Sequence, residues 1–174
     1  EGLRLDVIGG GRPRGLCGSG LVDALALLLR EGILDRSGRF VPPERCAHPQ
    51  LRERLGRDER GMTVFLLGGH RDGVALTQRD VREVQLALGA IRTGVEVLLA
   101  KRGVTRGEVD EVLLAGAFGN NLHVPSAVAV GLVPDVPPEK VRSVRNASGL
   151  GACRALASRS FYERTIRTAQ RMRY

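Results

Sequence analysis

The sequence predicts an α/β fold, because apolar residues at helical spacing alternate with short apolar runs and small-residue turns join them. Of the 174 residues, 43% are apolar and 26% charged, which is typical of a globular domain. No apolar run approaches the roughly 18–20 residues of a membrane-spanning helix, so we expect no membrane segment. Only 3% of residues are aromatic, so the core must consist mainly of Leu, Val, Ile and Ala.

The first part of the chain, residues 1–32, predicts one strand and one helix. Leu3 to Ile8 has the composition of a strand, and three consecutive glycines end it. The turn Gly15-Leu16-Cys17-Gly18-Ser19-Gly20 then opens a helix of about three turns. Apolar residues recur at helical spacing from Leu21 to Leu29, and Gly32 is a typical helix stop.

Residues 33–76 predict a small inserted subdomain. The segment contains three prolines and a charged helix candidate at 49–55. Met62 to Leu67 predicts a strand that pairs with residues 74–76, so that residues 68–73 form the turn of a hairpin.

The remainder, residues 77–174, begins with the clearest helix of the sequence. Thr77 and Asp80 have the spacing of a capping box. One stripe of this helix is apolar and predicts a packed face: Val81, Val84, Leu88, Ile91, Val95 and Leu98. A second stripe predicts either a solvated face or a pocket wall: Arg82, Gln85, Gly89, Arg92 and Glu96.

Strands and helices alternate after this helix. Strands are predicted at 111–114 and 141–144, and helices at 125–131, at 146–157 and from Phe161 onward. Such alternation implies a parallel or mixed sheet, whose ligands bind beyond the carboxyl ends of its strands.

Three turns of small residues lead into helices, at residues 18–20, 116–120 and 148–151. Unpaired amides and the positive end of the helix dipole make a helix start suitable for a phosphate group. The alternative is that these glycines only permit close packing of strand and helix. Neither a P-loop nor a GxGxxG pattern is present, so the familiar nucleotide fingerprints do not apply.

The net charge of +8 does not predict nucleic-acid binding, because the arginines are scattered and no nucleic-acid-binding motif accompanies them. The three cysteines lack a CxxC pair, which argues against a disulfide framework, a zinc site or an iron–sulfur cluster within this chain. Cys17, just before a helix, is either a redox thiol or a small packing residue. We expect a cytoplasmic protein, and a first residue other than Met predicts a piece of a longer chain.

Three blocks carry a resemblance to a known family: Gly15-Leu16-Cys17-Gly18-Ser19-Gly20-Leu21-Val22-Asp23, Leu76-Thr77-Gln78-Arg79-Asp80-Val81-Arg82-Glu83-Val84-Gln85-Leu86-Ala87, and Val112-Leu113-Leu114-Ala115-Gly116-Ala117-Phe118-Gly119-Asn120. In this order they resemble the ATP-dependent reductive activators of corrinoid proteins. Those activators belong to the ATPase superfamily of actin, sugar kinases and heat-shock chaperones (ASKHA). The third block departs from the superfamily by having Ala117 in place of a second glycine.

The resemblance implies a fragment of a ribonuclease-H-like (actin-like ATPase) lobe with a hairpin-bearing insertion. The parent protein would use ATP with Mg and an amino-terminal 2Fe–2S cluster, absent from this chain, to reduce Co(II) corrinoid to Co(I). Its partner would be a corrinoid protein of a methyltransferase system, and the parent would be a homodimer. The isolated fragment would neither hydrolyse ATP at a useful rate nor transfer electrons.

The resemblance also implies the residues that contact the nucleotide: Gly18, Ser19 and Gly20 at the first helix start, Gly116, Ala117, Gly119 and Asn120 at the adenosine-binding turn, and Arg82 and Gln85 beside the purine. Asn146 and Gly149 would help to close the lobe. No catalytic or metal-binding residue is expected in this part. Two alternatives stay open: a non-enzymatic dimerisation or docking lobe whose glycines only pack, and a small-molecule kinase of the same superfamily.

Overall fold

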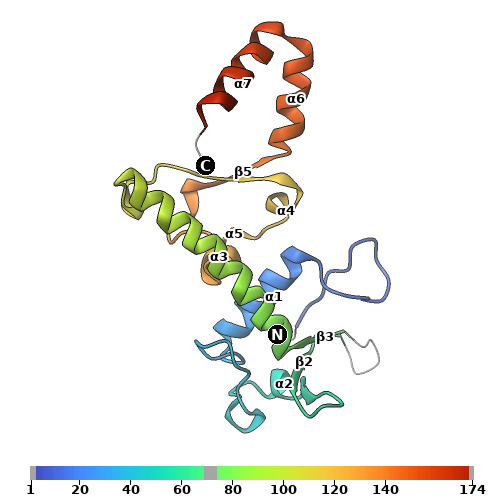
Figure 1. Ribbon diagram of the computed structural model, residues 1–174. Coiled ribbons are helices and arrows are strands. Elements are labelled where there is room, and N and C mark those ends of the chain that lie inside the picture. The colour runs from blue at the N-terminus through green and yellow to red at the C-terminus, as the bar shows by residue number, and fades with distance from the viewer. Residues whose placement is uncertain (1–2, 69–73, 173–174) are drawn as a thin grey trace.

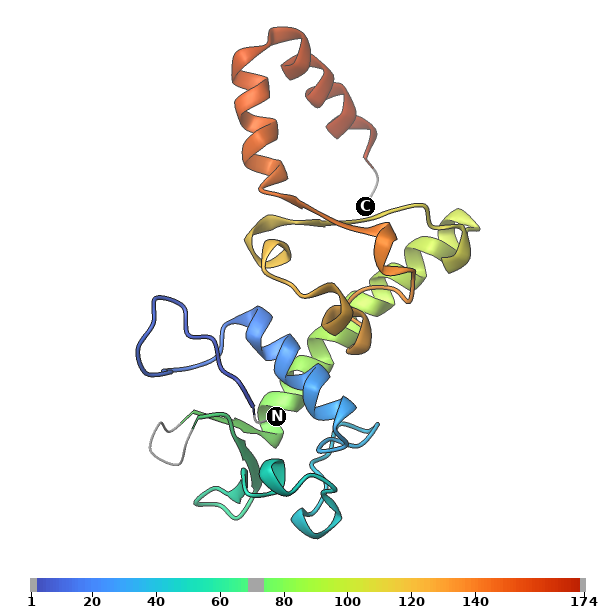
Figure 2. The same ribbon diagram turned by 180° about the vertical axis from the view of Figure 1, so that it is seen from behind.

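The computed structural model describes residues 3–68 and 74–172, which form an elongated mixed α/β arrangement (Figures 1 and 2). A small antiparallel sheet lies at one end, a parallel strand pair lies in the middle, and a helical hairpin projects at the other end. The helices are α1 (Gly18–Arg30), α2 (Pro49–Arg52), α3 (Gln78–Arg102), α4 (Gly116–Asn120), α5 (Val124–Ala129), α6 (Ala147–Ala157) and α7 (Arg159–Arg171). Short 3-10 turns are η1 (Pro43–Arg45), η2 (Arg106–Glu108) and η3 (Pro138–Lys140).

The antiparallel sheet consists of β1 (Leu55–Arg57), β2 (Thr63–Leu66) and β3 (Ala75–Thr77) in that order. Phe65 of β2 lies opposite both Leu55 and Leu76. The pairing of β2 with β3 confirms the predicted hairpin, whose turn at residues 69–73, including His70, lies outside the described residues. The third strand, β1, was not predicted.

A single apolar cluster joins this sheet to α1. Leu25 and Leu28 of α1 pack in one cluster with Ile33, Phe65 and Leu76, and all five are buried. The predicted insertion, residues 33–76, therefore shares its core with the helix that precedes it.

The central strands β4 (Val112–Ala115) and β5 (Val141–Arg145) are parallel, as their alternation with helices predicts. Their register shifts between Leu114 and Ala115, so that Ala115 lies opposite Arg145. A second apolar cluster, centred on Val22, Ala127 and Val133, packs α1 and α5 against this pair.

Helix α3 begins as the sequence predicts, because both hydrogen bonds of the Thr77–Asp80 capping box are present. It ends at Gly103, whose φ of +64° is typical of a residue that terminates a helix. The predicted packed stripe is only partly right. Val81 is buried, but Ile91 and Leu98 are exposed because the carboxyl-terminal half of α3 extends beyond the elements that cover its first turns.

The predicted strand at Leu3 to Ile8 is wrong for the described structure, in which this segment is an irregular loop. A strand needs a hydrogen-bonded neighbour, and none of the described strands pairs with these residues. The following glycines at 9–11 all have positive φ and turn the chain back toward α1.

Helices α6 and α7 form the projecting hairpin (Figure 1), and neither contains a buried residue. Across the described ranges, no helix combines the length and the apolar character that crossing a membrane requires.

Candidate functional site

The candidate site consists of the three small-residue turns that lead into helices, which are called bends below. The first bend is the start of α1. Cys17 is its N-cap, and the Sγ atom accepts a hydrogen bond from the Gly20 amide at 3.4 Å. The Sγ atom also lies 3.4 Å from the Ser19 hydroxyl oxygen. The first turn contains no acidic residue, so the helix dipole and the first-turn amides other than that of Gly20 can face an anion.

The hydrogen bond with Ser19, followed by that from the Gly20 amide, lowers the pKa of the exposed Cys17 thiol below its ordinary value. Near neutral pH more of Cys17 is therefore thiolate than of an unperturbed cysteine. We expect iodoacetamide at pH 7 to modify Cys17 about threefold faster than the exposed Cys153.

Replacing Ser19 with alanine should raise the Cys17 pKa and slow the modification of Cys17 at pH 7. At alkaline pH the Cys17 rates of the variant and of the wild type should converge. Peptide mass spectrometry measures each rate. Equal rates for Cys17 and Cys153 across the whole pH range would contradict the expectation.

The second bend joins β4 to α4. Gly116 has a φ of +90°, a conformation that side chains rarely adopt, and an added Cβ there would meet no atom within 4 Å. Gly119 is buried, and an added Cβ there would lie 3.2 Å from the Leu114 carbonyl carbon. Ala117 is exposed, and its carbonyl accepts a hydrogen bond from the Asn121 side chain at 3.2 Å. Gly116 therefore faces open space, whereas Gly119 serves close packing.

The first two bends touch through Phe118. A Cβ added to Gly18 would lie 2.6 Å from Cε2 of the Phe118 ring, so the ring rests on the backbone of α1. Close packing against the Phe118 ring thus explains why residue 18 is a glycine, as expected if the glycines of these turns permit close packing.

The third bend, between β5 and α6, joins the second through Asn120. The Ser143 hydroxyl donates to Asn120 Oδ1 at 2.9 Å. Beyond Ser143, Arg145 has a φ of +55°, and Asn146 caps α6 by accepting a hydrogen bond from the Gly149 amide at 2.9 Å. Two parallel strands thus end beside each other, where open α/β sheets bind ligands.

Arg82 and Gln85 contact the insertion and not the three bends. Both donate to the Ser37 carbonyl oxygen, at 3.3 Å and 3.1 Å, and Arg82 also donates to Gln85 Oε1 at 2.9 Å. Gln85 lines a cavity of about 310 Å³ between α1, α3 and α5, which does not include the three bends. Their place beside a purine stays a prediction.

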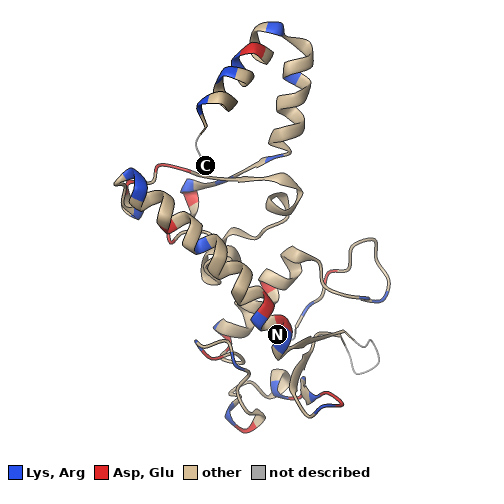
Figure 3. Ribbon diagram, viewed as in Figure 1, with Lys and Arg blue, Asp and Glu red and all other residues tan. Residues whose placement is uncertain are grey.

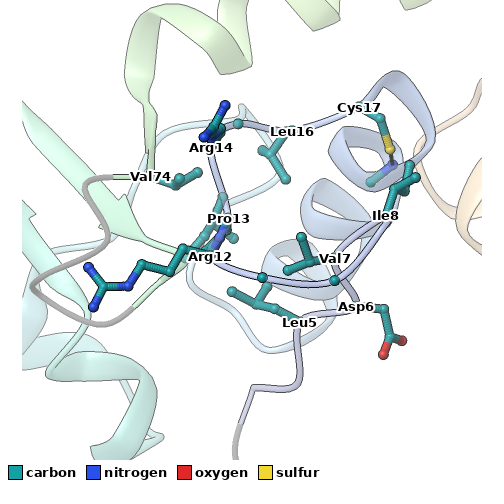
Figure 4. A pocket seen from close by; sticks show the side chains of 15 residues that line it. Leu5, Asp6, Val7, Ile8, Arg12, Pro13, Arg14, Leu16, Cys17 and Val74 are labelled. Carbon is teal, nitrogen blue, oxygen red and sulfur yellow. Dashed lines mark hydrogen bonds between the residues drawn. The ribbon is translucent and has the colours of Figure 1, made fainter.

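A larger cavity of about 850 Å³ lies inside the loop that precedes α1 (Figure 4). The side chains of Leu5, Val7 and Leu16 point into the loop, and the Asp6 carboxylate points away. Cys17 and Gly20 also line the cavity, so the start of α1 forms part of its wall. Its apolar lining suits the apolar part of a ligand.

Two residues of the site were not predicted as such, Phe118 and Ser143. Ser143 follows the carboxyl-end rule for parallel strands, which could have found it. The contact of Phe118 with Gly18 joins residues far apart in the chain and has no local signal in the sequence. Within the described residues, no three His, Cys, Asp or Glu side chains are grouped to hold a metal ion.

Parallel strands whose ends meet at small-residue bends, with an inserted sheet between two helices, agree with the actin-like ATPase lobe predicted from the sequence. The whole chain, residues 1–174, matches the family described as the C-terminal domain of RACo, the ASKHA domain, and it belongs to that family. The resemblance and the fold class predicted from the sequence are confirmed.

Individual relatives agree with this assignment. The chain is 41% identical over 156 residues to the corrinoid activation enzyme RamQ of Eubacterium limosum, covering 86% of this chain and 26% of that protein. It is 23% identical over 120 residues to the [Co(II) methylated amine-specific corrinoid protein] reductase of Methanosarcina barkeri, covering 69% of this chain and 18% of that protein.

A solved structure of a reductive activator for corrinoid, iron-sulfur protein superposes with a TM-score of 0.81 at 36% identity, covering 96% of this chain and 26% of that one. The chain therefore spans about a quarter of the length of RamQ and of the solved activator.

Proposed function

We propose that this chain is the part of an ATP-dependent corrinoid activator that lines one side of its nucleotide crevice. The observation that supports this most directly is Gly116 at the carboxyl end of β4, where φ is +90° and an added Cβ would meet no atom within 4 Å. The start of α1 contacts the same helix α4 through the Phe118 ring, and Asn120 of α4 contacts β5 through the Ser143 hydroxyl.

The activity of the whole protein is likewise a proposal, supported by the names of the relatives. One electron would pass from the reduced iron–sulfur cluster of the parent to a Co(II) corrinoid of the partner protein. This oxidises the cluster and yields Co(I). ATP with Mg would shift that equilibrium, which a ligand does only through unequal affinity for two states of the protein. We also propose that the activator is a cytoplasmic homodimer.

The expected result for Gly116→Val in the full-length protein is a loss of ATP affinity of about tenfold or more, because valine forces a strained φ and fills the open space. Calorimetric titration with MgATP measures the affinity. Reduction of Co(II) to Co(I), followed by absorbance, should fall in parallel.

The matched control is Gly107→Val, since Gly107 also faces open space but has an ordinary φ and lies outside the site. Thermal unfolding of both variants separates misfolding from lost binding. Unchanged ATP affinity in a folded Gly116→Val protein would contradict the placement of the crevice.

A further inference from the structure

Arg145, the last residue of β5, has an unusual backbone conformation. Within the described residues it is the only one other than glycine with a positive φ, at +55°. This left-handed region is disfavoured for arginine, because the Cβ atom comes too close to the following carbonyl oxygen. Strained residues of this kind persist only where the surrounding structure enforces them, and they are concentrated at functional sites.

The pairing of β4 with β5 holds Arg145 in this conformation. The register advances from Leu114 opposite Ser143 to Ala115 opposite Arg145, so Val144 is an extra residue on β5. An extra residue of this kind changes the direction in which the next side chain points, and it is often found beside active sites. The Arg145 amide also donates to the Ser143 hydroxyl oxygen at 3.4 Å, and that hydroxyl is itself bonded to α4.

The Arg145 side chain is an exposed cation at an edge that lacks carboxylates. Among the residues that the structure describes, no ion pair or hydrogen bond holds its guanidinium, whereas Arg142 of the same strand pairs with Glu111 at 2.5 Å. The first turns of α1, α4 and α6 contain no acidic residue, and Figure 3 shows no red along α4 or at the start of α6. The residue opposite Arg145 directly precedes Gly116, where the proposed crevice lies.

We propose that the Arg145 guanidinium binds the phosphate groups of the nucleotide. A guanidinium offers parallel N–H donors that match two phosphate oxygens. Because strand pairing, and not a bound partner, fixes the backbone at this residue, the cation is positioned before the ligand arrives. The inference rests on the proposed nucleotide crevice. The competing partner is a carboxylate from the rest of the parent protein, and the test separates the two.

The test uses the full-length protein that carries this chain and calorimetric titration with three probes: MgATP, inorganic tripolyphosphate and adenosine. Arg145→Gln should weaken binding of MgATP and of tripolyphosphate about tenfold or more, because the charge and its paired donors are lost. Adenosine has no phosphate, so its affinity should stay within about twofold of the wild-type value. Arg145→Lys keeps the charge without the paired donors and should cost about threefold.

Arg145→Gly separates a binding role from a structural one. Glycine adopts a positive φ without a steric penalty, so the midpoint of thermal unfolding should stay at the wild-type value or rise. The affinity for MgATP should nevertheless fall as far as in Arg145→Gln. The matched control is Arg154→Gln, which removes the same charge from an exposed position within α6 and should leave all three affinities unchanged.

Unchanged MgATP affinity in a folded Arg145→Gln protein overturns the inference, and so does an equal loss of affinity for adenosine. A lower unfolding midpoint for Arg145→Gly with unchanged MgATP affinity would assign Arg145 to a carboxylate elsewhere in the parent, which also overturns it. Failure of the proposed function gives a different result. A wild-type protein that binds tripolyphosphate through Arg145 but does not bind MgATP would contradict the proposed function and leave the anion site standing.

Discussion

Phe65→Ala is expected to lower the free energy of unfolding by about 3–5 kcal/mol, the range for truncating a fully buried aromatic residue. Phe65 has no exposed surface and lies on β2, between Leu55 of β1 and Leu76 of β3. The same apolar cluster includes residues of α1, so the cavity would weaken both the small sheet and the helix that starts at the site. Urea unfolding followed by circular dichroism measures the change.

The control for Phe65 is Met62→Ala, at an exposed apolar residue just before the same strand. This substitution should change stability by no more than about 0.5 kcal/mol. Similar losses for the two variants would mean that the small sheet does not belong to the cooperative core.

The second large effect is expected for Gly119→Val, which should destabilise the protein by about 1–3 kcal/mol. A Cβ at this position would lie 3.1 Å from the Leu114 Cβ and 3.2 Å from the Leu114 carbonyl carbon, and backbone cannot move aside as a flexible side chain can. Valine would therefore push α4 away from the end of β4. Because Asn120 follows directly, the hydrogen bond with Ser143 should weaken as well.

Ala117→Val provides the matched control in the same short helix, because Ala117 is exposed. Thermal unfolding should separate the two variants, with a lower midpoint for Gly119→Val alone. If both variants unfold like the wild type, α4 does not pack as closely on β4 as the structure shows.

Local patterns predicted the helices well. The capping box at Thr77 and the glycine stop at Gly103 bound α3, and apolar periodicity predicted α1. These helix signals depend on residues close together in the chain, which is why the sequence alone was sufficient for them. The alternation of strands and helices predicted a parallel or mixed sheet, and β4 and β5 are parallel.

The wrong or missing strands depend on distant partners. Leu3 to Ile8 has strand composition, but a strand forms only where another strand accepts its hydrogen bonds. Conversely, β1 contains Gly56 and Arg57 and has little strand character of its own. It forms because β2 pairs with it from Thr63 to Phe65.

The site was predictable as a set of bends and not as a set of contacts. The carboxyl-end rule placed the 116–120 and 146–151 turns at one edge. The Phe118 ring on Gly18, and the hydrogen bonds of Arg82 and Gln85 to Ser37, join segments whose proximity only the tertiary fold creates. Whether Arg82 and Gln85 contact a nucleotide stays a prediction.

Helix α1 contacts three parts of the described fold. Gly18 lies against the Phe118 ring of α4, Leu25 and Leu28 belong to the apolar cluster shared with the small sheet, and Val22 belongs to the cluster beside β4 and β5. Because these contacts share one helix, a substitution that shifts α4 relative to Gly18 is expected to disturb the packing of α1 in both clusters.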